Sequence, residues 1–92
     1  MTDYSYAEFE QDLPDLWEVD FRIGRQNFHY ERDYISRDKT WRFWLAGPKG
    51  ALLFDEVVDS QDGMAEKVLG LEVCEGKTLA ELWDRLEITG LV

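Results

Sequence analysis

An alternation of apolar and polar residues in three segments between residues 17 and 45 constrains this chain more than any other feature. In residues 17–23 every second side chain is apolar, and those between are charged. The apolar positions are Trp17, Val19, Phe21 and Ile23, and the charged ones are Glu18, Asp20 and Arg22. This period of two is typical of a half-buried strand, because successive side chains point to opposite faces of a sheet. The segment therefore predicts a strand with one face on a core.

Residues 28–34 and 41–45 continue the same pattern. Residues 52–58 follow the third turn and predict a fourth strand. The stretches between the strands are short and contain glycine, proline or small polar residues, which favour turns. These turn segments are residues 24–27, 36–39 and 47–50. Four strands joined in sequence by short turns predict an antiparallel meander.

A helix is expected before the meander. Ser5 and Glu8 have the spacing of a capping box, in which each side chain accepts a hydrogen bond from the backbone of the other residue. Apolar residues then follow at helical intervals. Pro14 disfavours helical angles in the residue before it, so we expect the helix to cover about residues 5–13.

Two more helices are expected after the meander. Asp59 or Ser60 is placed to cap the first, which would run to about Leu69 and stop at Gly70. A second capping box, Thr78 to Glu81, precedes apolar residues at positions i, i+3, i+4 and i+7. These residues are Leu79, Leu82, Trp83 and Leu86.

Together these segments predict one α+β domain over residues 1–92. It has an N-terminal helix, a four-stranded antiparallel meander and two C-terminal helices packed on one sheet face. The length of 92 residues is close to that of a typical single domain, about 100–150 residues.

The net charge of −10 narrows the classes of partner. Residues 1–20 and 51–92 are both strongly acidic, whereas residues 21–50 carry seven basic and three acidic side chains. Nucleic acids and anionic membranes attract positive charge, so neither is an expected partner. No apolar run is long enough to span a membrane. The single cysteine, Cys74, excludes an internal disulfide and favours a reducing, cytoplasmic setting.

No group of residues has the spacing that catalysis or metal binding requires. Residues 76–78 (Gly-Lys-Thr) resemble the end of a phosphate-binding loop, but the preceding glycine is one residue too far away, and a turn followed by a helix cap is the favoured interpretation. His29 and Cys74 are read as a surface histidine and a half-buried thiol rather than a nucleophilic pair. Zinc and calcium spacings are absent. We therefore expect no enzyme activity, no metal and no cofactor.

Basic and aromatic residues lie close together in the meander. Alternation places Trp44 and Arg42 on the sheet face away from the helices, with Arg22 on a neighbouring strand. Tryptophan and arginine are frequent anchors of protein interfaces. Three interpretations stay open: a solvated face with cross-strand ion pairs, a surface for a protein or a second copy, and a surface for single-stranded nucleic acid. The first is favoured and the last is the weakest.

Residues 76–83 (Gly-Lys-Thr-Leu-Ala-Glu-Leu-Trp) fit the pattern G-K-[ST]-L-x-[DE]-[IL]-W. With residues 54–60 they resemble a group of short, uncharacterised bacterial and phage proteins, in which a meander precedes an acidic helix and a terminal helix of that pattern. The resemblance rests on capping and core residues, so it implies a shared fold and no catalytic residue. In size and charge the chain is similar to immunity proteins, which inhibit toxins by binding them.

The sequence therefore favours a non-enzymatic, acidic, cytoplasmic protein that binds a basic protein partner, as an inhibitory protein would. The acidic residues expected to carry this binding are Glu8, Asp12, Asp15, Asp55, Asp59 and Asp62, with Trp44 as an anchor. A homo-oligomeric module that pairs through the outer sheet face or an edge strand is the alternative. A small ligand-binding domain or enzyme is a third possibility, and it would require a pocket lined by converging polar groups.

Overall fold

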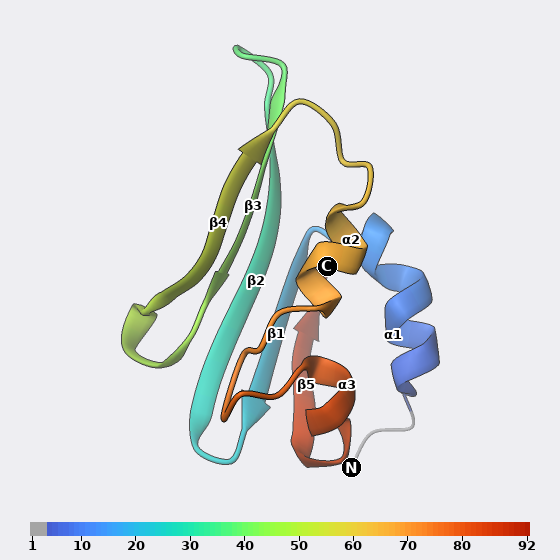
Figure 1. The fold of residues 1–92 in the computed structure, drawn as a ribbon, viewed down its shortest axis with the longest axis vertical. Helices are drawn as coiled ribbons and strands as arrows, with labels where there is room; N and C mark the ends of the chain where they lie inside the picture. The colour runs from blue at the N-terminus through green and yellow to red at the C-terminus, as the bar shows by residue number, and fades with distance from the viewer. Residues whose placement is uncertain (1–3) are drawn as a thin grey trace.

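The computed structural model describes residues 4–92, and its frame is an antiparallel sheet (Figure 1). Within these residues the sheet has five strands in the order β4-β3-β2-β1-β5. The strands are β1 (Glu18–Ile23), β2 (Gln26–Ile35), β3 (Thr40–Ala46), β4 (Leu52–Val58) and β5 (Leu86–Leu91). β1 pairs with β2, β2 with β3, and β3 with β4, so the predicted meander and the α+β class are confirmed.

The first hairpin turns within two residues, Gly24 and Arg25. Gly24 has a φ of +62°, a left-handed conformation that glycine adopts at little steric cost. The sequence pattern assigns four residues, 24–27, to this turn. In the structure Gln26 already pairs with Ile23, so β2 begins earlier than predicted. The tight turn fixes the register of β1 against β2.

The C-terminal segment differs from its prediction. The pattern predicts a helix through Leu86, but α3 (Leu79–Leu82) has only four residues and is followed by a 3-10 turn at Trp83–Arg85. Leu86 then begins β5, which pairs antiparallel with β1 and makes the sheet five-stranded rather than four-stranded. Residues 88–90 are β-branched residues and a glycine, which are weak helix formers. If this segment were a helix, the backbone N–H and C=O groups on the edge of β1 would have no strand partner, and β5 pairs with them.

The N-terminal helix starts at the predicted capping box. The backbone N–H of Glu8 donates to the Ser5 hydroxyl at 3.1 Å, and the Ser5 N–H donates to the Glu8 carboxylate at 3.4 Å. The helix, α1 (Tyr6–Asp12), is followed by a 3-10 turn at Leu13–Asp15. Pro14 lies inside this turn, near its start, where the missing N–H of proline removes no helical hydrogen bond.

The helix after the meander is shorter than expected. α2 (Met64–Leu69) is preceded by Gly63, which has a φ of +77° and provides no side-chain cap. The predicted start at Asp59 or Ser60 is therefore wrong. The Ser60 hydroxyl instead accepts a hydrogen bond from the backbone of Asp62 at 3.1 Å and stabilises the loop before the helix.

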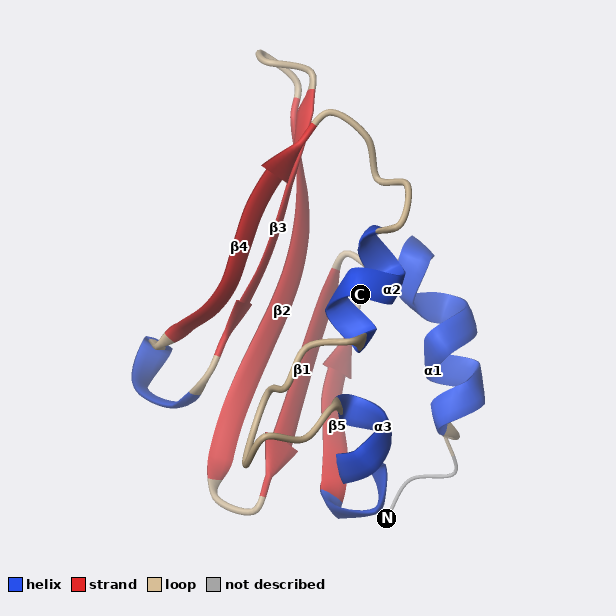
Figure 2. Cartoon of the chain, viewed as in Figure 1, coloured by secondary structure: helices blue, strands red, loops and turns tan. Residues whose placement is uncertain are grey.

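The three α-helices of residues 4–92 lie on one side of the sheet, as Figures 1 and 2 show, and a 3-10 turn at Pro48–Gly50 connects β3 to β4. The core fills the space between them and the sheet. Its fully buried side chains include Leu13, Val19, Leu45 and Leu82. Trp17, which alternation assigns to this core, instead precedes β1 and is 44% exposed. None of the helices in the described part of the chain is long and apolar enough to cross a membrane.

Candidate functional site

The candidate site is the sheet face opposite the helices, called here the outer face. Within residues 4–92, none of the three α-helices covers it, because all three lie on the other side of the sheet (Figure 2). The face carries six carboxylates, two guanidinium groups and the single histidine. These residues are Glu18, Asp20, Glu31, Asp33, Asp55, Glu87, Arg22, Arg42 and His29. With the imidazole neutral, six negative and two positive groups give −4, so the outer face is acidic.

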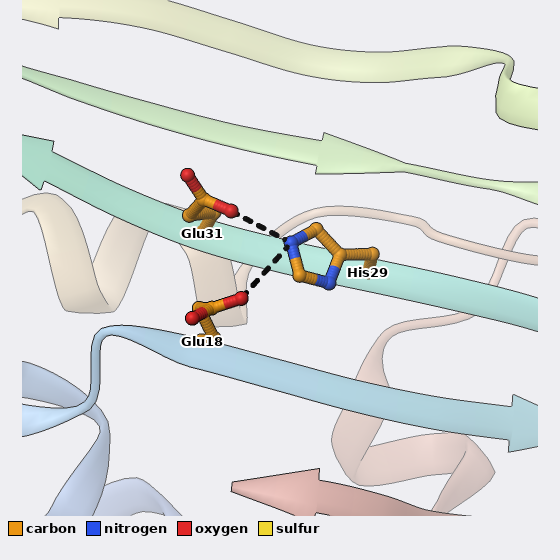
Figure 3. A group of neighbouring side chains, drawn as sticks. All are labelled: Glu18, His29 and Glu31. Carbon is orange, nitrogen blue, oxygen red and sulfur yellow. Dashed lines mark hydrogen bonds and ion pairs between the residues drawn. The ribbon is translucent and has the colours of Figure 1, made fainter. Parts of the chain in front are cut away.

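The single histidine lies among carboxylates from two strands. The tight β1–β2 turn places Asp20 opposite His29 and Glu18 opposite Glu31. The Nδ1 atom of the ring is 2.6 Å from the Asp20 carboxylate. The other ring nitrogen, Nε2, is 2.9 Å from the Glu31 carboxylate and 3.9 Å from that of Glu18. Figure 3 shows both glutamates directed at this one nitrogen. Glu18, His29 and Glu31 are called here the histidine cluster.

The surroundings of His29 act on its pKa in opposite directions. Burial lowers the pKa, because desolvation disfavours the charged imidazolium. Hydrogen bonds with Glu31 and Asp20, and their negative charges, favour the imidazolium and outweigh burial, so the pKa is raised from its ordinary value. The hydrogen bond with His29 lowers the pKa of Glu31, but burial and the neighbouring Asp33 outweigh it and raise the pKa. Both pKa values are therefore raised, and neighbouring carboxylates contribute to each shift, because negative charge is in excess around the cluster.

Trp44 packs beside the histidine cluster. Its ring centroid is 5.1 Å from that of His29, and its indole N–H donates to the Asp33 carboxylate at 3.2 Å. The side chain is half-buried, not fully exposed as alternation alone would suggest. The hydrogen bond to Asp33 satisfies the indole N–H and helps to hold the ring in place.

The two arginines expected beside Trp44 have different positions. Arg42 lies 5.4 Å from the Trp44 ring and donates two hydrogen bonds to the Asp55 carboxylate, at 2.8 and 3.0 Å. This contact raises the pKa of Arg42 and lowers that of Asp55. Arg22 pairs instead with Glu87 on β5. The structure therefore brings Trp44 and Arg42 together, and Arg22 lies apart from them.

The acidic residues expected to meet a partner are spread over three places. Asp55 is on the outer face, paired with Arg42. Glu8 and Asp12 belong to α1, where Glu8 caps the helix and Asp12 accepts a hydrogen bond from Tyr4. Asp15 ends the 3-10 turn after α1, and Asp59 and Asp62 lie in the loop between β4 and α2. These six residues do not form one surface.

A pocket of about 390 Å³ lies between the 3-10 turn after α1, the start of α2 and the sheet. Its lining includes two of the predicted acids, Asp15 and Asp62, and the buried Arg32. The Nη1 atom of Arg32 donates to the carbonyl of Pro14 and to the Gln61 side chain, both at 2.6 Å. No carboxylate of residues 4–92 is within ion-pair distance of this guanidinium. This buried cation is held by neutral acceptors, so we interpret its role as structural. It links the 3-10 turn after α1 to the loop before α2.

The other residues considered for chemistry have structural contacts. The Cys74 thiol donates to the Gln26 side chain at 3.4 Å, and both ring nitrogens of His29 face carboxylates. The Thr78 hydroxyl accepts from the backbone of Glu81 at 3.4 Å, and Glu81 accepts in return from the Thr78 N–H at 3.0 Å. Thr78 thus caps α3, as the sequence predicts.

The histidine cluster is the main feature that sequence reasoning missed. Its three members are not a local motif, because Glu18 comes from β1 and the other two from β2. The signal that would reveal it is the register of the hairpin. Once the turn is limited to Gly24 and Arg25, Glu18 falls opposite Glu31, with His29 two residues before it on the same face.

Comparison of the chain with protein-family models, with curated proteins and with solved structures found no match.

Proposed function

We propose that this protein binds a basic protein partner through its outer face and has no catalytic role. The composition of the outer face supports this most directly. No α-helix of the described residues covers this face, and its ionisable side chains give a net charge of −4. It also displays the half-buried Trp44 beside Arg42. Acidic surfaces attract basic partners over distance and speed their association. Tryptophan and arginine often provide the central contacts of an interface.

The charge lies on a rigid support. The outer-face side chains stand on a continuous sheet, and several are held by hydrogen bonds, as Arg42 is by Asp55 and Trp44 by Asp33. Side chains already fixed in place lose little conformational freedom when a partner binds. We propose Trp44 as the contact residue at the centre, with the surrounding carboxylates providing attraction and orientation.

A comparison of charge-matched variants tests this proposal. The outer-face variant Asp33→Asn/Asp55→Asn and the control Glu10→Gln/Glu72→Gln lose the same charge, but the control residues lie outside the outer face and are exposed. Each protein is used as bait in lysate from the cells that encode it, with thermal melting as a check of folding. We expect the wild type and the control to enrich the same basic protein, and the outer-face variant to retain at most about one tenth of it.

Salt and Trp44→Ala provide the second part of this test. Raising the salt concentration from about 0.1 M to about 1 M shortens the Debye length from roughly 10 Å to roughly 3 Å, so the partner should dissociate. Trp44→Ala should weaken capture without changing its dependence on salt. Equal capture by both charge variants, or capture that is insensitive to salt, would contradict the proposal.

Self-association through the edge strand β4 is the second candidate. Three large apolar side chains of this strand are exposed, at 54%, 43% and 57%: Leu52, Leu53 and Val57. An edge strand with exposed apolar residues is a template for pairing with a second copy. Light scattering at high protein concentration decides between the candidates. A dimer that Val57→Lys converts to a monomer would favour self-association, and a strict monomer excludes it.

A further inference from the structure

We propose that Glu18, His29 and Glu31 form a binding site for one divalent transition-metal ion, with Zn²⁺ as the best-fitting candidate. The site does not depend on the proposed protein partner. It offers one imidazole nitrogen and two carboxylate oxygens from two paired strands, and all three ligand atoms lie within 4.8 Å of one another. One nitrogen and two oxygens are ligands that zinc accepts in open sites, where water fills the fourth position.

The two distances from the His29 nitrogen to the glutamate oxygens are close to those of a tetrahedral ion. Bonds of about 2.0–2.1 Å to nitrogen and oxygen place neighbouring ligand atoms roughly 3.3 Å apart in a tetrahedral site. The His29 nitrogen is 2.9 Å from the Glu31 oxygen and 3.9 Å from the Glu18 oxygen, one slightly shorter and one slightly longer than that value. Small rotations of the two glutamate side chains would equalise these distances, while the strands stay in place.

The orientation of His29 favours a cation at Nε2. Asp20 lies 2.6 Å from Nδ1, so a hydrogen on Nδ1 points to this carboxylate. In the neutral ring the lone pair of Nε2 then faces two carboxylate oxygens, which repel it. A cation between them removes this repulsion. A carboxylate that holds the far nitrogen of the ring is the usual support of a metal-binding histidine, so Asp20 acts as a positioning residue.

The charge of the surroundings favours two positive charges over one. Four carboxylates, Glu18, Asp20, Glu31 and Asp33, stand on adjacent positions of β1 and β2. Arg42, which lies beside Trp44, donates two hydrogen bonds to Asp55 rather than to these four carboxylates. The imidazole prefers Zn²⁺ to Mg²⁺ or Ca²⁺, which take oxygen ligands. Because the ring of Trp44 lies 5.1 Å from His29, its fluorescence provides a local signal of binding.

Titration with ZnCl₂ tests the site. The protein is used without any histidine tag and as Cys74→Ser, which removes the only thiol and hence the main competing ligand. Calorimetry should show one Zn²⁺ per chain, with little heat from an equal concentration of MgCl₂. His29→Gln should weaken binding at least about tenfold, Glu31→Gln should also weaken it, and Asp20→Asn should weaken it by about tenfold through the orientation of the ring. Glu72→Gln, with the same loss of charge elsewhere, should bind Zn²⁺ like its parent.

A second measurement, spectroscopy of the wild type with Zn²⁺, does not depend on whether a variant folds. Zn²⁺ should shift the backbone amide signals of residues 18–20 and 29–31 in the nuclear magnetic resonance spectrum, and it should change Trp44 fluorescence. Shifts confined to other segments, a His29→Gln protein that is folded and binds as tightly as its parent, or no binding at all would each overturn the assignment. Loss of zinc binding by His29→Gln while the protein partner is still captured would separate this site from the proposed protein interface.

Discussion

The guanidinium carbon of Arg32 lies 4.2 Å from the centroid of the Trp17 ring, so a buried cation is covered by a tryptophan that leaves 44% of its own surface exposed. The contact is a cation–π interaction. The same guanidinium donates hydrogen bonds to Pro14 and Gln61, and the backbone N–H of Arg32 donates to the carbonyl of Trp17 at 2.8 Å. Arg32 therefore joins β2 to residues 14–17, which precede it in the chain, and to Gln61, which follows it.

Removal of this link should destabilise the fold without affecting the outer face. Arg32→Ala leaves the Pro14 carbonyl without its charged donor and removes the contact with Trp17. We expect a loss of about 3 kcal/mol in the free energy of unfolding, measured by urea denaturation. Arg32→Lys keeps the charge but lacks the fork of donors, and should lose about half as much. A change below about 0.5 kcal/mol in Arg32→Ala would show that the link carries no stability.

Leu82 tests the position of the core. It is fully buried at 0% exposure, although it ends a helix of only four residues. Leu82→Ala should cost about 2–5 kcal/mol, because the lost methyl groups leave a cavity. Val57→Ala removes apolar atoms from a side chain that is 57% exposed and should change stability by less than about 0.5 kcal/mol. Equal costs in thermal or urea melts would contradict this arrangement of the core.

The capping box of α3 should have a measurable effect. Thr78→Ala removes the oxygen that accepts the Glu81 N–H, and we expect a loss of about 1 kcal/mol. Thr78→Ser keeps that oxygen and should be close to the wild type. Circular dichroism during denaturation measures both variants. Similar losses for the two variants would mean that the threonine methyl group, rather than the hydroxyl, stabilises this turn.

Ionisation of Tyr30 should limit stability in alkaline solution. Burial raises the pKa of Tyr30 to about 12, although the nearby Arg32 lowers it. The neutral phenol is favoured in the folded state, so its contribution is complete below the unfolded pKa of about 10 and is lost as the pH rises through about 12. Urea denaturation of the wild type should therefore show falling stability over this range. Tyr30→Phe should fall less steeply, and an unchanged slope would assign the effect to other tyrosines.

Alternation and turn residues made the sheet predictable, because a period of two has one structural interpretation when turns punctuate it. β4 also matches its predicted bounds, although its own sequence does not alternate and only its place after a turn indicated a strand. The caps of α1 and α3 were predictable for the same reason, since a capping box is a local motif. β5 was not, because Leu86 is buried equally well in a helix or in a strand, and only the open edge of β1 decides between them.

The candidate site was only partly predictable, because it depends on pairing between strands. Alternation correctly placed Trp44 and Arg42 on the outer face. It gave no information on their neighbours, which depend on register. The acidic residues of α1 were grouped with Asp55 by charge alone, yet they lie on different elements. The partner, the immunity-like role and the resemblance to other short bacterial proteins stay predictions.

The pairing of β1 with β5 affects how the protein is made. The two strands lie far apart in the sequence, and the N–H of Val92 donates to the carbonyl of Glu18 at 3.0 Å. During synthesis β1 can pair with β2 early, but its other edge stays bare until β5 has been made. A bare strand edge invites pairing with other chains, so slow release at this stage carries a risk of aggregation. Such long-range closure also predicts slower folding than a helical protein of the same length would show.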